Sequence, residues 1–298
     1  MQNNRITRCL APLCVAAMLS GCGQVDSLLV MDEAGGSNKS SSLFSFNGSS
    51  NEPETPSTPS GLAKVDNPII FLESAAQFAE RNREYETAAK HWAHLSSLDP
   101  DNMSYASKLA VSLRILGRHE DAERVLLQAL RQEPTNIDLT EEMAKTLIAS
   151  GRLREGVVLL EELSARPGID KPRAARLYSA MGVAYDRAEQ HAKAQQQYRR
   201  ALEAEPHNAM ALNNMGLSYA MDGKLDIAER TLRQALVAPT ASTQVRQNLA
   251  MVLSLRGQTD EARRLVSQDL PPSLVRKTVS YYGGIADQRD AWRDAATQ

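Results

Sequence analysis

The sequence has few of the residues that stabilise or mark several common classes of protein. It contains only three cysteines in 298 residues, too few for a disulfide framework. Aromatic residues make up 5% of the chain. No stretch approaches 18 consecutive apolar residues, so we expect no membrane-spanning helix. A chain of this length can still bury a stable hydrophobic core without disulfide bonds.

The sequence also lacks a large excess of charge of either sign and any familiar catalytic motif. Lys and Arg number 34 against 36 Asp and Glu, a net charge of −2 without a basic run, which argues against a nucleic-acid partner. We find no glycine-rich phosphate loop, nucleophile elbow or zinc-protease motif, so neither an enzyme nor a cofactor is expected. His91 and His94 can share a helix face but lack a third ligand, so no metal site is expected.

The N-terminus is typical of a lipoprotein signal. Residues 9–20 form an apolar stretch that follows two arginines and is too short to span a bilayer. The motif Leu-Ser-Gly-Cys that ends at Cys22 matches a lipobox, in which the cysteine sulfur takes a diacylglycerol group as a thioether. We therefore expect residues 1–21 to be a signal peptide and Cys22 to be acylated, with palmitate among the chains. The alternative is an ordinary secretory signal with an incidental cysteine.

Acylation would fix the location of the protein. Two or more acyl chains give a stable membrane anchor. Residue 23 is Gly and not Asp, and an Asp after the lipidated cysteine tends to retain lipoproteins in the inner membrane of enteric-type bacteria. We therefore expect a lipid-anchored protein on the periplasmic face of the outer membrane, with the inner membrane as the alternative.

Residues 22–68 are interpreted as the lipidated N-terminus and a disordered linker. More than half of residues 23–67 are Ser, Gly, Asn, Pro or Thr, and such a segment buries too little apolar surface to fold. As a flexible chain it would span roughly 35–40 Å, so it predicts a tether. Two apolar islands, residues 28–31 (Leu-Leu-Val-Met) and 43–46 (Leu-Phe-Ser-Phe), are either docking patches or incidental.

Beyond this segment the sequence repeats every 34 residues. The units are 69–102, 103–136, 137–170, 175–208, 209–242 and 243 to about 270. Their eighth and twentieth residues are small in every unit, which allows two antiparallel helices to approach closely. These residues are Ala76, Ala110, Ala144, Gly182, Gly216 and Ala250 at the eighth place, and Ala88, Ala122, Gly156, Ala194, Ala228 and Ala262 at the twentieth.

Other features recur at the same period. A large residue follows the twentieth place by four, at Trp92, Leu126, Leu160, Tyr198, Leu232 and Val266. Turn glycines stand at 117, 151, 223 and 257, and units end in Pro followed by Asn102, Asn136 or Asn208, which can cap the next helix. The array resembles the tetratricopeptide repeat (TPR) family. The resemblance implies an all-α solenoid of about six helix-turn-helix repeats over residues 69–270.

The array departs from the family pattern in three places. Arg83 and Glu189 replace the turn glycine, and four extra residues, 171–174, lengthen the connection after the third unit. We expect this longer loop either to bend the solenoid or to divide it into two lobes of three repeats. In residues 271–298 we expect a capping helix over 273–282, ended by Gly283 and Gly284, and then a polar tail.

The first helix of each unit should line a groove. In the last two full units, deformable Met side chains and hydrogen-bonding amides would suit a bound peptide. The predicted peptide-binding residues are Met210, Asn213, Asn214, Leu217, Met221, Gln247, Asn248 and Met251. The alternative is that the asparagines brace neighbouring repeats and that some Met side chains belong to the core. The second and third units carry charges instead, which we interpret as a solvated face: Lys108, Arg114, Asp138, Glu141, Glu142 and Lys145.

The last repeat carries a more specific resemblance. Residues 245–272 begin Val-Arg-Gln-Asn-Leu-Ala and end Asp-Leu-Pro-Pro, and they resemble the end of the TadD-like lipoproteins of the Tad (Flp) pilus system. That family is related in plan to the TPR lipoproteins that chaperone type IV pilus secretins. The resemblance implies an adaptor that binds a secretin or another pilus component and promotes its assembly. The alternative is a periplasmic scaffold that recruits peptidoglycan hydrolases or proteases; the oligomeric state stays open.

Overall fold

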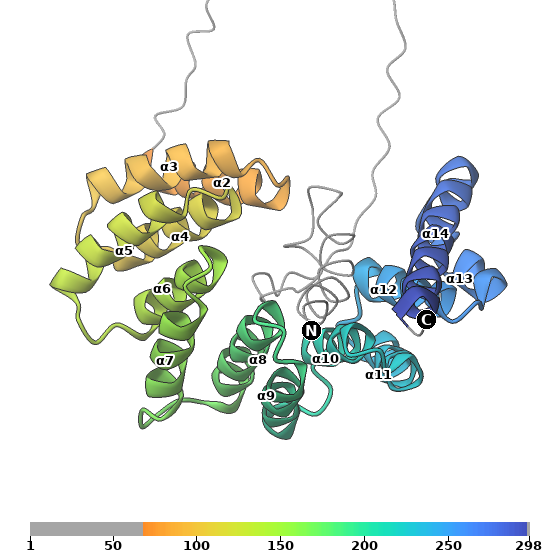
Figure 1. Ribbon diagram of the computed structural model, residues 1–298. Coiled ribbons are helices and arrows are strands. Elements are labelled where there is room, and N and C mark those ends of the chain that lie inside the picture. Colours follow the sequence, from red (N-terminus) through yellow and green to blue (C-terminus); the bar gives the residue numbers. More distant parts are fainter. Residues whose placement is uncertain (1–67, 297–298) are drawn as a thin grey trace, which may run out of the picture. The chain divides into compact units, whose positions relative to one another are not determined.

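The computed structural model describes the backbone of residues 68–296 and the side chains of residues 68–284. Thirteen helices and no strands lie in this part of the chain (Figure 1), which confirms the all-α prediction. The first twelve helices form six consecutive pairs, as the 34-residue period predicts. The pairs are α2 (Pro68–Arg81) with α3 (Tyr85–Leu98), α4 (Met103–Ile115) with α5 (His119–Gln132), α6 (Ile137–Ala149) with α7 (Leu153–Ser164), α8 (Lys171–Arg187) with α9 (His191–Ala204), α10 (Ala209–Met221) with α11 (Leu225–Val237), and α12 (Thr243–Leu255) with α13 (Thr259–Val266).

The two helices of each pair meet at the small residues. A β-carbon added to Gly182 on α8 would lie 2.4 Å from Cε1 of Tyr198 on α9, and one added to Gly216 on α10 would lie 2.7 Å from Cγ of Leu232 on α11. Tyr198 and Leu232 are two of the six large residues that follow the twentieth place by four, a set that we call the column of large residues. All six are fully buried. The recurring small and large positions therefore interlock within each repeat.

The turns inside the repeats share one backbone geometry. Gly117, Gly151, Gly223 and Gly257 have φ between 75° and 87°, the left-handed conformation that ends a helix and favours glycine. Arg83 and Glu189 adopt the same conformation, with φ of 60° and 57°. The two departures from the glycine pattern therefore keep the turn, at a cost in backbone strain.

Asparagine caps begin three of the first helices, as the sequence predicts. The side chains of Asn102, Asn136 and Asn208 accept hydrogen bonds from backbone N–H groups two or three residues further along the chain. Each satisfies one of the donors that the first turn of a helix leaves without a partner. The caps fix where α4, α6 and α10 begin.

Residues 171–174 form the first turn of α8 and not a loop. Asp170 caps this helix by accepting a hydrogen bond of 2.8 Å from the backbone N–H of Arg173. Leu163 of α7 and Leu177 of α8 lie in one buried cluster, so the third and fourth repeats stay packed together. The predicted division into two lobes of three repeats is therefore wrong. The chain divides instead after Gln132, so that α2–α5 belong to one compact unit and α6–α14 to the other.

A final helix, α14 (Pro272–Ala296), covers the end of the last repeat. Val275 and Val279 pack into the cluster that contains Leu253 and Val266, which confirms the predicted cap. The predicted end at Gly283 and Gly284 is wrong, because the helix continues through both. Each glycine costs a helix only about 1 kcal/mol relative to alanine, which the turns on either side offset.

Cys22 and the predicted tether lie outside the described residues. Within the described residues, no helix combines the length and the apolarity that a membrane crossing requires.

Replacing Glu189 by glycine should stabilise the protein by about 1 kcal/mol, because glycine adopts the left-handed turn without the steric cost of a β-carbon. Gly151→Ala, in the equivalent turn of the preceding repeat, should destabilise it by a similar amount. Urea unfolding monitored by circular dichroism measures both changes. Equal stability of Glu189→Gly and the parent chain would mean that the turn carries no strain.

Gly182→Ala should destabilise the fold by about 1–3 kcal/mol, because its new methyl group would overlap the buried ring of Tyr198. Gly283→Ala is the matched control. A β-carbon there meets nothing within 4 Å, so the better helix propensity of alanine should leave stability equal or higher. Thermal unfolding of the two variants should shift in opposite directions.

Candidate functional site

The first helices of repeats three to six lie next to one another. Helix α8 contacts both α6 and α10, and α10 contacts α12. These four helices carry all the predicted peptide-binding residues and most of the charged stretch. Three polar clusters join them, one between α10 and α12, one between α6 and α8, and one between α8, α9 and α10.

The asparagines of α10 and α12 bind one another. Nδ2 of Asn248 donates to Oδ1 of Asn213 at 2.7 Å, and Nδ2 of Asn213 donates to Oδ1 of Asn214 at 3.1 Å. All three side chains are buried. The amides therefore link the fifth repeat to the sixth, which is the bracing role that the sequence left open as an alternative.

The other predicted peptide-binding residues fall into two groups. Leu217 and Met251 are buried, whereas Met210, Met221 and Gln247 are half-buried. A partner would therefore reach Met210 at the start of α10, Met221 at its end and Gln247 on α12. Peptide binding by this set stays a prediction.

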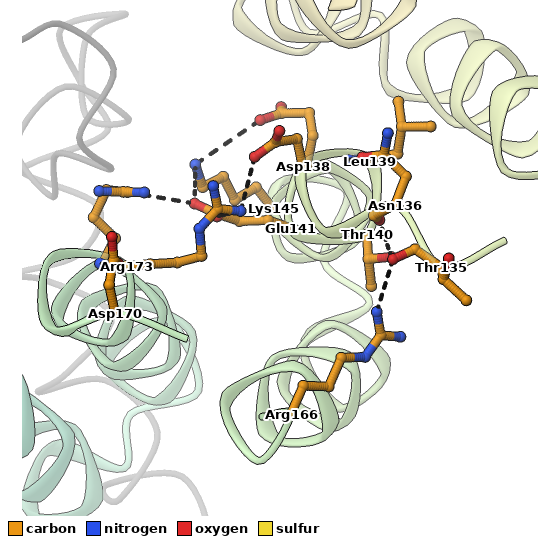
Figure 2. Close-up of polar contacts among 12 residues, drawn as sticks. Thr135, Asn136, Asp138, Leu139, Thr140, Glu141, Lys145, Arg166, Asp170 and Arg173 are labelled. Atoms are coloured by element: carbon orange, nitrogen blue, oxygen red, sulfur yellow. Dashed lines mark hydrogen bonds and ion pairs between the residues drawn. The ribbon is translucent and has the colours of Figure 1, made fainter. Parts of the chain in front are cut away.

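The charges of the third repeat form a cluster with two arginines of α8 (Figure 2). Nζ of Lys145 lies 3.0 Å from Oε1 of Glu141, and Nη1 of Arg173 lies 2.8 Å from Oδ1 of Asp138 and 3.7 Å from Oε2 of Glu141. Arg176 approaches Glu141 at 3.8 Å. Glu141 thus faces three cations, and the cluster joins α6 to α8.

The interpretation of these charges as a solvated face is wrong for Glu141, Glu142 and Lys145, which are buried. The extra turn of α8 supplies Arg173, one of the cations that face Glu141. The carboxylates of α6 therefore lie within ion-pair distance of cations from α6 and α8. Breaking one pair would leave a buried charge without compensation, so the cluster fixes how α6 and α8 pack.

Lys108 and Arg114 are the two remaining members of the predicted charged stretch. Both are half-buried on α4, in the other compact unit. The ammonium group of Lys108 lies over the ring of Trp92, 4.4 Å from its centre. Lys108 therefore has a cation–π partner within its own unit.

A third cluster surrounds the buried carboxylate of Asp186 near the end of α8. Its oxygens accept hydrogen bonds from the hydroxyl of Tyr198 at 3.0 Å and from Oγ of Ser218 at 2.7 Å, and Nδ1 of His191 lies 2.8 Å away. Tyr198 and His191 belong to α9, and Ser218 belongs to α10. One carboxylate therefore ties together the fourth and fifth repeats.

Burial and hydrogen bonding shift the proton affinities of this cluster. Burial raises the pKa of the Asp186 carboxyl, and its three hydrogen-bonding partners offset only part of that effect. The hydrogen bond to Asp186 raises the pKa of His191, while partial burial opposes it. The serine bonds the carboxylate and not the histidine, so these groups do not form a nucleophile–base–acid relay.

Neither the two arginines of α8 nor the cluster around Asp186 was predicted from the sequence. In that cluster, His191, Tyr198 and Ser218 lie 5, 12 and 32 positions after Asp186 in the sequence. No local sequence motif identifies residues at these spacings. One signal was present. Tyr198 is the only hydroxyl-bearing residue in the column of large residues, and a buried Tyr hydroxyl usually needs a partner.

The protein is a solenoid of helix-turn-helix repeats. This class is defined by the helix pairs, by their interlocking small and large positions and by the turn that they share. Models of the tetratricopeptide repeat match residues 75–137, 113–181, 179–244 and 244–268. These matches together cover almost all of the six helix pairs, and the chain belongs to the tetratricopeptide repeat family.

The chain is also similar to one curated protein and to solved structures. The chain is 32% identical over 155 residues to protein y4yS of Sinorhizobium fredii, a match that covers 52% of this chain and 72% of that protein. It shares its fold with PilW, a type IV pilus biogenesis factor, at 17% identity and a TM-score of 0.58, covering 71% of this chain and 97% of PilW.

A TPR protein of Thermus thermophilus, TTC0263, gives a TM-score of 0.50 at 24% identity, with 60% of this chain and 97% of that one covered. These likenesses show the fold. TPR repeats typically form scaffolds for protein–protein interaction rather than catalytic sites.

The His191–Asp186 pair should make stability depend on pH. A raised pKa in the folded state means that the stabilisation is fully present below the ordinary histidine value of 6.5 and is lost as pH rises through the raised pKa. The urea midpoint should therefore be lower at pH 8 than at pH 6. His191→Gln should remove much of this difference, and His207→Gln, on an exposed loop residue, should keep it. An unchanged difference in His191→Gln would assign the pH dependence to other groups.

Proposed function

We propose that this protein is a lipid-anchored adaptor of the outer membrane that binds a secretin or another pilus component and promotes assembly of a Tad/Flp-type pilus apparatus. The observation that carries the proposal is the TPR solenoid, with the partly exposed Met210, Met221 and Gln247 on the first helices of its last two repeats. Flexible Met side chains beside an amide suit an amphipathic segment of a partner protein.

Two further observations support the pilus assignment. The final repeat resembles the end of TadD-like lipoproteins, and PilW, whose fold this chain shares, is a type IV pilus biogenesis factor. The lipobox at Cys22 supplies the membrane address in this proposal. Acyl chains on Cys22 would hold the array at the periplasmic face, where a secretin subunit is inserted.

Charged substitutions at the partly exposed methionines should weaken partner binding. Met210→Glu together with Met221→Glu places two charges in an apolar contact, and we expect the captured secretin to fall about tenfold or more. Val237→Glu is the matched control, because Val237 is the most exposed large apolar residue described, on α11. It should leave capture, secretin multimers and surface pili unchanged.

The outcome in cells separates this proposal from its alternative. Deletion of the gene should abolish surface pili and reduce secretin multimers, and Cys22→Ser should keep a folded array that fails to deliver the secretin. Normal multimers and piliation in the deletion strain would contradict the proposal. Capture of a peptidoglycan hydrolase or protease in place of a secretin would favour the scaffold function.

A further inference from the structure

The first helix of the array exposes an aromatic face. Phe71 and Phe78 on α2 are 63% and 58% exposed, and they stand seven residues apart, which places them on one side of the helix. Ile70 beside them is 60% exposed. Phenylalanine side chains rarely stay this open on a protein without a partner.

The equivalent positions are buried in every later repeat. Phe71 is the third residue of its unit and Phe78 is the tenth. The third residues of the other units are Tyr105, Leu139, Leu177, Ala211 and Val245, and the tenth are Ser112, Thr146, Ala184, Ser218 and Val252; none is more than 4% exposed. The first repeat therefore exposes two phenylalanines at positions that the other repeats bury.

In at least two of these repeats, the second helix of the preceding repeat covers the third position. Tyr105 of α4 stacks on Trp92 of α3 with ring centres 6.0 Å apart. In the other unit, Leu177 of α8 packs with Leu163 of α7. No helix precedes α2 among residues 68–296. Among the described residues, no other helix covers this end of the array, and repeat arrays require a cap on an exposed end.

We propose that residues 43–46 of the same chain, Leu-Phe-Ser-Phe, bind the face formed by Phe71 and Phe78. The whole chain contains four phenylalanines, two on this face and the other two in this segment. The other apolar island, residues 28–31, has no aromatic residue. Aromatic pairs contribute stabilisation beyond the burial of their surface, which favours this segment as the occupant.

The intervening chain is long enough for this contact. Twenty-four residues separate Phe46 from Phe71, and as a coil they span roughly 25–30 Å, more than the length of about 21 Å expected for α2. A linker of this kind gives an effective concentration near the millimolar range. A weak contact would therefore suffice to keep the segment bound, whereas a second copy would have to reach that concentration in solution.

The contact would shorten the tether, a consequence that rests on the proposed lipidation of Cys22. With residues 43–46 bound to α2, only residues 23–42 remain free between the lipid and the array. Their coil span is roughly 22–27 Å, against roughly 35–40 Å for residues 23–67. Release of the segment would then extend the reach of the array from the membrane.

Cross-linking in the full chain tests the contact. Ser45 lies between the two phenylalanines of the segment, and Ser74 is exposed between Phe71 and Phe78 on the same side of α2. In S45C/S74C, a short bis-maleimide should link the two positions within one chain, as identified by mass spectrometry of the peptides. The matched control is S45C/S97C, because Ser97 is exposed on α3 and faces away from that repeat's core. We expect about fivefold or more cross-linking in the first pair.

Two further variants in the S45C/S74C background show which residues are responsible. F44S/F46S should reduce cross-linking to the level of the S45C/S97C control, and L28S/L29S should leave it unchanged. Equal yields for the two cysteine pairs would overturn the proposal. A link that forms only between two chains would overturn it as well and would make a second copy the occupant of the face.

Discussion

The close approach of two helices at paired small residues is the contact on which the rest of the molecule depends. Where Gly182 faces Tyr198 there is no room for one additional carbon atom. Because each repeat has the same contact, the second helix presents its large residue to the first helix at the same height every time. The regular stacking of repeats three to six, and with it the alignment of α6, α8, α10 and α12, follows from that local fit.

Buried polar groups then fix the register between neighbouring repeats, which the apolar contacts alone do not determine. Apolar side chains of similar volume can slide or repack, but a buried carboxylate such as Asp186 is tolerated only where its partners are in place. The pairs between α6 and α8, the Asp186 cluster and the asparagines of α10 and α12 each lie at a different junction between repeats. Neighbouring repeats are thus held in one register by hydrogen bonds and ion pairs as well as by burial.

Much of the fold could be predicted from the sequence, because the small and large positions recur in all six units and the turn glycine recurs in four. The six large residues that recur at this period, among them Trp92 and Val266, are all buried. Features that occur only once in the sequence were harder to predict. Residues 171–174 begin a helix because Asp170 caps it, and α14 passes Gly283 because the turns on either side offset the cost of a glycine.

The candidate site was less predictable than the fold. Spacing placed Asn213 and Asn248 on the first helices, but it could not show that they bind each other, since that depends on the distance between two repeats. The ion pairs of Glu141 likewise involve arginines more than 30 residues away in sequence. Periodicity predicts which helix carries a side chain, and the packing of the next repeat decides what that side chain contacts.

The cluster around Asp186 has a consequence for cooperativity. In a linear array, each repeat has an intrinsic stability and each junction adds a coupling energy. Because a buried carboxylate shared by α8, α9 and α10 would lose its partners if these helices separated, the fourth and fifth repeats are expected to open together. Thermal fluctuations that fray the array should start at its ends and stop at this junction, so that the amides of repeats four and five exchange their hydrogens together and last.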